Sequence, residues 1–159
     1  MQTVEEFLAY AILLEKEAAD RYGELADTME ASGNREVGKL FRQLSEYSRM
    51  HLADATARAG FREVPDLRAV SLGWRDFENP ETAAIWAADP MIGREQALEI
   101  ALDAEIAGYD YYRNVRDTTT DPEIRALAIE FTEEESEHVA ELRKWIAAHK
   151  AGKPLPVDR

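Results

Sequence analysis

The distribution of glycine and proline limits this chain to long helices arranged in two pairs. The 159 residues hold only 8 Gly and 6 Pro, and the stretches between them are rich in Ala, Leu, Glu and Arg, which favour helix. Two long stretches without proline come before one breaker-rich segment, and two long helix-favouring stretches come after it. The breakers in this segment are Gly60, Pro65, Gly73, Pro80, Pro90 and Gly93. The chain is therefore expected to be all-α.

Capping residues set the limits of four helices. Thr3 can begin the first, with Glu6 placed to complete the cap, and Asp121 followed by Pro122 can begin the fourth. A tight turn separates the two helices of each pair. The predicted helices cover residues 3–29, 35–59, 94–117 and 122–149.

Two helical hairpins joined by a long connection describe a ferritin-like four-helix bundle. The connection at residues 60–93 lets the second and third helices run parallel, which a simple up-down-up-down bundle would not need. Within this crossover, residues 79–86 have the pattern of a short capped helix. We expect one domain over 1–150, because single cores usually hold roughly 100 to 200 residues, followed by an extended tail at 151–159.

Three carboxylates lie on the apolar stripes that should face the core. Glu15 has apolar residues three, four and seven positions away on either side, and Glu105 and Glu135 occupy similar positions in the third and fourth helices. An ionised carboxylate is costly to bury without a partner, so three that face one another need a compensating cation. A bound metal ion would supply that charge.

Two histidines extend this pattern. His138 follows Glu135 by three residues, which allows both side chains to reach one ion, and His51 faces inward from the second helix. Either histidine alone is also compatible with an ordinary hydrogen-bonded core residue, and a Glu-x-x-His pair is weak evidence in a chain with 32 acidic residues. Because all four helices place such a group inward near their middle, we predict a metal site formed by Glu15, His51, Glu105, Glu135 and His138.

Two tyrosines follow inward glutamates at the same spacing. Tyr22 comes seven residues after Glu15, and Tyr112 comes seven residues after Glu105. This echo is typical of two similar hairpins related by an approximate two-fold axis. The tyrosines fit equally well as core aromatics or as hydrogen-bond donors to ligand carboxylates.

Charge and composition exclude several classes of partner and chemistry. The formal net charge of −13 disfavours binding to nucleic acid and to anionic membranes. The absence of Cys excludes disulfides, thiolate zinc sites, iron–sulfur centres and thiol nucleophiles. No apolar run reaches transmembrane length, and the first residues do not resemble a signal peptide, so we expect a soluble cytoplasmic protein.

The candidate ligands resemble those of the rubrerythrin branch of the ferritin-like superfamily. That family has Glu, Glu-x-x-His, Glu and Glu-x-x-His on successive helices around a di-iron centre. The resemblance covers nearly all of the chain outside the crossover and the tail. Two positions differ, because Ser48 replaces the carboxylate of the second helix and Gly108 replaces a second carboxylate of the third. The matching residues are Glu15, His51, Glu105, Glu135 and His138.

The resemblance implies a non-haem iron protein that oxidises Fe(II) with peroxide or O2. It implies that Glu105 and Glu135 bridge two ions, that Glu15 is a terminal ligand and that each histidine binds one ion. It further implies a homodimer. Family members receive electrons through a Cys-rich module that this sequence lacks, so an external electron-donor protein would be needed.

The two departures from the family pattern leave a second hypothesis open. Three glutamates and two histidines can bind one ion, or two with additional water ligands, and Zn or Mn could replace iron. Because Ser48 and Gly108 remove two carboxylates, the chain could instead be a non-enzymatic bundle that binds a single metal or serves in binding or assembly. The sequence does not decide whether it is an enzyme.

Overall fold

The computed structural model describes residues 3–60, 92–155 and 158, and these residues form four long helices. All four predicted long helices are present, with their ends shifted by two residues or fewer. Most of the connection, including the short helix predicted at 79–86, lies outside the described residues. The helices are α1 (Val4–Ala31), α2 (Arg35–Ala59), α5 (Arg94–Thr118) and α6 (Pro122–Lys150).

The predicted capping residues begin α1 and α6. The Thr3 hydroxyl oxygen accepts a hydrogen bond from the Glu6 backbone N–H at 3.1 Å, and the hydroxyl donates to the Glu6 carboxylate at 3.3 Å. The Asp121 carboxylate accepts bonds from the backbone N–H groups of Glu123 and Ile124, at 2.8 and 3.2 Å. Each cap satisfies N–H groups that have no partner within the helix, a contribution of about 1 kcal/mol.

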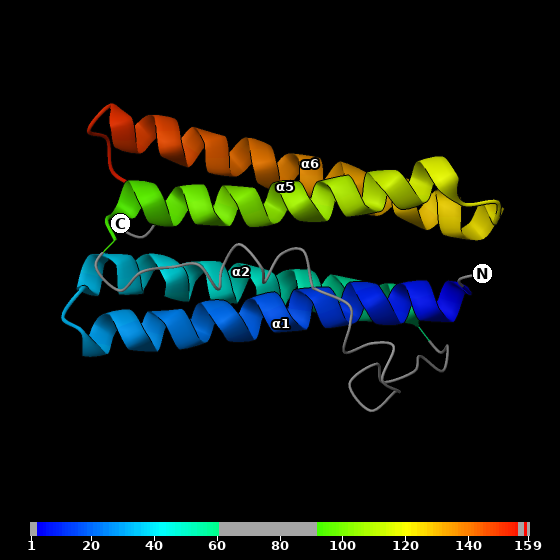
Figure 1. Cartoon of the computed structure of the whole chain (residues 1–159), viewed down its shortest axis with the longest axis horizontal. Coiled ribbons are helices and arrows are strands. Elements are labelled where there is room, and N and C mark those ends of the chain that lie inside the picture. Colours follow the sequence, from blue (N-terminus) through cyan, green and yellow to red (C-terminus); the bar gives the residue numbers. More distant parts are fainter. Residues whose placement is uncertain (1–2, 61–91, 156–157, 159) are drawn as a thin grey trace.

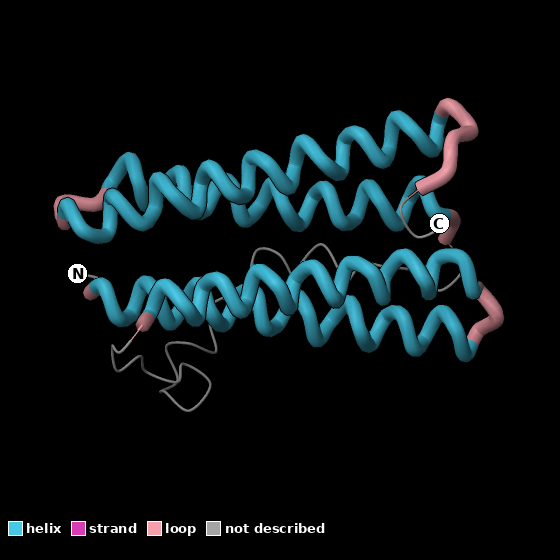
Figure 2. Tube along the Cα trace, turned by 180° about the vertical axis from the view of Figure 1, so that it is seen from behind, coloured by secondary structure: helices cyan, strands magenta, loops and turns pink. Residues whose placement is uncertain are grey.

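The helices form two antiparallel hairpins that lie side by side (Figure 1). α1 packs closely on α2, and α5 packs closely on α6, whereas the two hairpins approach each other less closely. The sequence colours of Figure 1 show α2 and α5 running in the same direction, and the view from behind shows the same two helical pairs (Figure 2). This arrangement confirms the prediction of an all-α, ferritin-like four-helix bundle.

Large side chains make the contacts between the hairpins. The ring of Phe7 on α1 lies 5.7 Å from the ring of Phe131 on α6, measured between centroids. The rings of Tyr47 on α2 and Trp145 on α6 are also 5.7 Å apart. At the end of α2, the Arg58 guanidinium lies over the Phe131 ring, with its carbon 4.9 Å from the ring centroid. The hairpins are therefore held together by aromatic side chains that span the space between their backbones.

The buried apolar residues divide into two clusters along the bundle. One cluster includes Tyr22, Phe41 and Leu98, and the other includes Phe7 and Tyr112 near the N-terminal end of α1. Apolar area is thus buried toward both ends of the bundle, which provides most of the driving force for folding. None of the described helices has an apolar stretch sufficient to cross a membrane.

The C-terminal residues pack against the same bundle. Leu155 is only 1% exposed and belongs to the cluster that contains Leu98. The Asp158 carboxylate accepts two hydrogen bonds from the Arg94 guanidinium, at 2.9 and 3.1 Å, and one from the Leu155 backbone N–H at 2.8 Å. These contacts connect the end of the chain to the first residue of α5.

Replacement of Leu155 by alanine should lower the free energy of unfolding by about 2–4 kcal/mol, because it leaves a cavity in a packed cluster. Urea denaturation followed by circular dichroism measures this change. Met50→Ala is the matched control, since Met50 is 62% exposed, and its effect should stay within about 0.5 kcal/mol. Equal effects of the two substitutions would show that Leu155 does not anchor the tail.

Candidate metal centre

The five residues predicted from the sequence meet between the two apolar clusters. On α1, Glu15 lies between Ala11 of one cluster and Ala18 of the other. The candidate ligands on the other three helices are likewise flanked by members of both clusters. Glu15 is 6% exposed and Glu135 is 3% exposed. The middle of the bundle is therefore a polar layer enclosed between two apolar ones.

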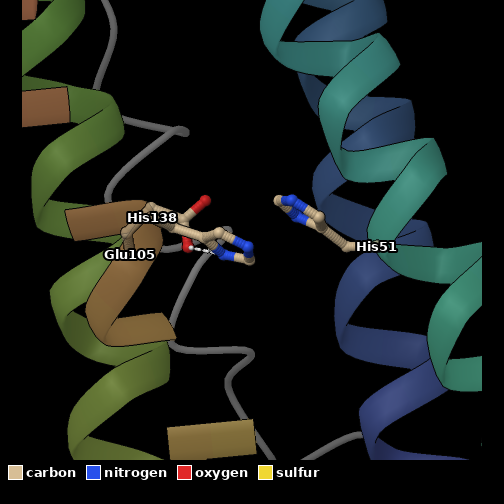
Figure 3. A group of neighbouring side chains, drawn as sticks. All are labelled: His51, Glu105 and His138. Carbon is tan, nitrogen blue, oxygen red and sulfur yellow. Dashed lines mark ion pairs between the residues drawn. The ribbon is translucent and has the colours of Figure 1, made fainter. Parts of the chain in front are cut away.

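The second hairpin supplies a compact group of donors. The Nδ1 atom of His138 lies 3.5 Å from the Oε2 atom of Glu105 and 3.5 Å from the Oε2 atom of Glu135. Figure 3 shows Glu105 and His138 extending from α5 and α6 toward the first hairpin. The His138 imidazole is therefore close both to Glu135 of its own helix and to Glu105 of α5.

The first hairpin completes the group from the opposite side. Its histidine, His51, extends from α2 toward His138 (Figure 3), and its Nδ1 atom is 3.8 Å from the Glu15 carboxylate. The rings of His51 and His138 are nearly parallel, with centroids 3.7 Å apart and an interplanar angle of 10°. Each histidine therefore has a glutamate of its own hairpin beside it and the other histidine against its face.

Three of these residues are close enough to share one ion after a small movement. Donor atoms of His51, Glu105 and His138 all lie within 4.8 Å of one another. Donor atoms bound at about 2.1 Å in a tetrahedral site lie about 3.4 Å apart, so a pair near the 4.8 Å limit would have to approach by about an ångström or more. Side-chain rotation can provide a change of this size without moving the helices.

Several buried donor atoms of this layer lack a conventional hydrogen bond. Within the described part of the chain, His51 Nδ1, His138 Nδ1 and Glu105 Oε2 are buried and have no hydrogen-bond partner. The separations of 3.5 and 3.8 Å given above are too long for such bonds. Leaving a buried polar atom unpaired costs about 1–3 kcal/mol. Imidazole nitrogen and carboxylate oxygen are suitable ligands for iron, zinc and manganese, so the donor set fits a bound metal.

The electrostatic environment keeps Glu105 ionised. Burial by itself raises the pKa of the Glu105 carboxyl group, but the close approach of the Glu135 and His138 side chains and the nearby histidine charges lower this pKa to about 2. Burial lowers the pKa of His51, yet the neighbouring Glu15 and Glu105 carboxylates outweigh it and raise that pKa. The layer therefore attracts positive charge, whether that charge is a proton or a metal ion.

The two positions that depart from the expected ligand pattern are both buried. Ser48 is 3% exposed, and Gly108 lies on the buried face of α5. Glu46, the acidic residue nearest to Ser48 on α2, is exposed and therefore does not replace it. Among the described residues, the layer offers three carboxylates and two imidazoles as ligands.

Sequence reasoning missed a cavity that adjoins this layer. It has a volume of about 320 Å³ and is lined by Ser48 together with His51, Glu105 and His138. Leu44, Tyr47, Leu142 and Trp145 form much of its apolar wall. The sequence signal that could have predicted the cavity is Ser48, because a serine at an inward position leaves space that a longer side chain would fill.

Tyr22 and Tyr112, which each follow an inward glutamate by seven residues, lie in different apolar clusters. Tyr22 is 2% exposed and stacks on Phe41, with ring centroids 6.0 Å apart. Tyr112 is 1% exposed and packs between Phe7 and Phe131. Both tyrosines are core aromatics, and a hydrogen bond from either to a ligand carboxylate stays a prediction.

Comparisons with known proteins agree with the sequence pattern. The profile of the Rubrerythrin family matches residues 6–146. The crystal structure of an uncharacterized conserved protein from Magnetospirillum magnetotacticum MS-1 is 36% identical in sequence and superposes with a TM-score of 0.65. That similarity covers 98% of this chain and 98% of the other. A search of curated proteins found no match.

Replacing Glu105 and Glu135 together by alanine should abolish metal binding, because it removes two of the three buried carboxylates. Equilibrium dialysis against Zn²⁺ or Fe(II), followed by elemental analysis, measures bound metal per chain. Glu133→Ala with Glu137→Ala is the matched control, since it removes two exposed carboxylates from α6. Unchanged metal content in the Glu105/Glu135 variant would contradict the assignment of the site.

Metal binding should also stabilise the fold. An ion that binds only the folded state adds about 2.7 kcal/mol at a free concentration roughly 100 times its dissociation constant. Thermal unfolding with Zn²⁺ and after chelation measures this effect as a higher Tm of the loaded protein. The Glu105/Glu135 variant should show no such increase, and an equal increase in that variant would place the bound ion elsewhere.

Proposed function

Because the chain belongs to the rubrerythrin family, we propose that it is a non-haem iron protein that oxidises Fe(II) with hydrogen peroxide or O2. One observation carries most of this proposal: a layer of carboxylates and imidazoles is buried between two apolar clusters, and it contains donor atoms without conventional hydrogen bonds. A purely structural polar layer would be expected to satisfy these atoms within the protein.

The proposed ligand roles are those that the resemblance to the family implies. By that resemblance, Glu105 and Glu135, which both lie beside His138, would be the bridging carboxylates. Glu15 is the proposed terminal ligand on the side of His51, which it approaches to 3.8 Å. Each histidine would then serve one of two ions, and the apolar clusters would keep bulk water away from both.

Iron is the proposed metal because it adds redox chemistry to a donor set that also suits zinc and manganese. Held by these residues, iron would supply the two electrons that, together with two protons, reduce hydrogen peroxide to two molecules of water. The chain's own part is to hold the carboxylates ionised, as the low pKa of Glu105 indicates. The imidazoles must be neutral to act as ligands.

Repeated turnover would require a separate source of electrons. The 159 residues contain no cysteine and therefore no thiolate electron-transfer centre. We propose that an external donor protein returns the electrons after each reaction. Without such a donor, oxidation should stop after the bound Fe(II) has reacted once.

Anaerobic loading with Fe(II) followed by peroxide or O2 tests the proposed function. We expect about two iron ions per chain and a rapid rise in ferric absorption in a stopped-flow spectrometer. One metal ion per chain with no faster oxidation than free Fe(II) would contradict the proposal. That result would favour the single-metal bundle that Ser48 and Gly108 leave open.

The same variants serve as controls for the redox reaction. The Glu105/Glu135 alanine variant should oxidise Fe(II) no faster than buffer does, whereas the Glu133/Glu137 variant should match the wild type. Circular dichroism of both variants shows whether the bundle is retained. Fast oxidation by the Glu105/Glu135 variant would place the reaction outside the polar layer.

A further inference from the structure

The cavity beside the polar layer has one polar edge and one apolar wall. Its polar edge is formed by Ser48 and by the His51, Glu105 and His138 group described above. The apolar wall includes Leu44 and Leu142 and the facing rings of Tyr47 and Trp145. Such a combination of an apolar body and a few convergent polar groups is typical of sites for small organic molecules.

The volume of the cavity sets the size of a suitable ligand. At about 320 Å³, it has roughly twice the volume of an engineered protein cavity of about 150 Å³ that binds benzene. A molecule with one ring and a short side chain, or with an eight-carbon chain, is of suitable size. Trp145 is held in the wall by a hydrogen bond from its indole N–H to the Glu141 carboxylate at 3.0 Å.

The charges around the cavity determine which head group can enter. Among the described residues that line it there is no lysine or arginine, and Glu105 and Glu141 are both acidic. An anion therefore has no permanent cation to pair with in this cavity. If two divalent ions occupy the polar layer, however, their charge exceeds that of Glu15, Glu105 and Glu135 by one. An anionic ligand would then restore neutrality.

Ser48 marks the place where that anion can bind. It is buried on α2 three residues before His51, and it lines the cavity. A serine side chain is too short to act as the carboxylate expected at this position, so it leaves a ligand position and the space beside it. We propose that the cavity binds a small organic carboxylate whose head group completes the metal centre beside Ser48. This inference rests on the metal centre of the proposed function.

Calorimetric titration of the full chain with octanoate and acetate tests this inference. The Zn²⁺-loaded protein is used because zinc is redox-inert, and the metal-free protein is the comparison. We expect octanoate to bind only when metal is present. Each buried methylene should tighten binding roughly fourfold, the factor that corresponds to about 0.8 kcal/mol, so octanoate should bind far more tightly than acetate.

A single substitution separates the cavity from the metal centre. Ser48→Glu should keep or increase the bound Zn²⁺ but weaken octanoate binding about tenfold or more, because the new side chain would fill the ligand position. Ser136→Glu is the matched control, since it adds the same charge at an exposed serine of α6. The control should bind both metal and octanoate as the wild type does.

The outcomes distinguish this inference from the function on which it rests. If the wild type binds metal but not octanoate, the inference is wrong and the proposed function is unaffected. If octanoate binds equally well without metal, or no more tightly than acetate, the carboxylate is not held as proposed. If the chain binds no metal at all, both proposals fail together.

Discussion

The gathering of three carboxylates and two imidazoles in one layer inside the bundle is the constraint on which the rest of the structure depends. Glu15 and Glu135 are almost completely buried, and the pKa of Glu105 is lowered to about 2, so negative charge persists inside the protein. Such charge is tolerated only when a cation or a network of hydrogen bonds offsets it. The buried nitrogens of His51 and His138 lack such bonds among the described residues. A bound metal ion would supply both the charge and the partners that these atoms lack.

This constraint also explains the division of the core. An apolar cluster lies on each side of the layer. The pair Phe7–Phe131 joins the hairpins in one cluster, and the pair Tyr47–Trp145 joins them at the other. The polar layer alone would not hold the hairpins together, because its like charges repel one another. The apolar clusters supply the cohesion, and the layer they enclose supplies the ligands.

Local sequence rules predicted the four long helices and the inward positions of the candidate ligands. The caps at Thr3 and Asp121 are formed as expected, and the three-, four- and seven-residue spacings correctly placed Glu15 and Glu135 inside. These rules describe one helix at a time. They therefore predict which face a residue occupies, but not how far the facing helices stand apart.

The features that sequence reasoning missed all depend on that separation. The stacking of His51 on His138 and the cavity beside Ser48 arise from the distance between the hairpins, which no periodicity encodes. The burial of Leu155 in the core could not be predicted either, because a single leucine in a Pro-rich tail has no periodic spacing that indicates a buried face. The differences of one or two residues at some helix ends reflect local geometry that the capping residues do not determine.

The most direct test of this account is anomalous diffraction at the iron edge from crystals grown with Fe(II). We expect the anomalous density to lie between the two hairpins, within ligand distance of Glu105, His51 and His138. Density at exposed acidic residues, with none in the polar layer, would contradict the account.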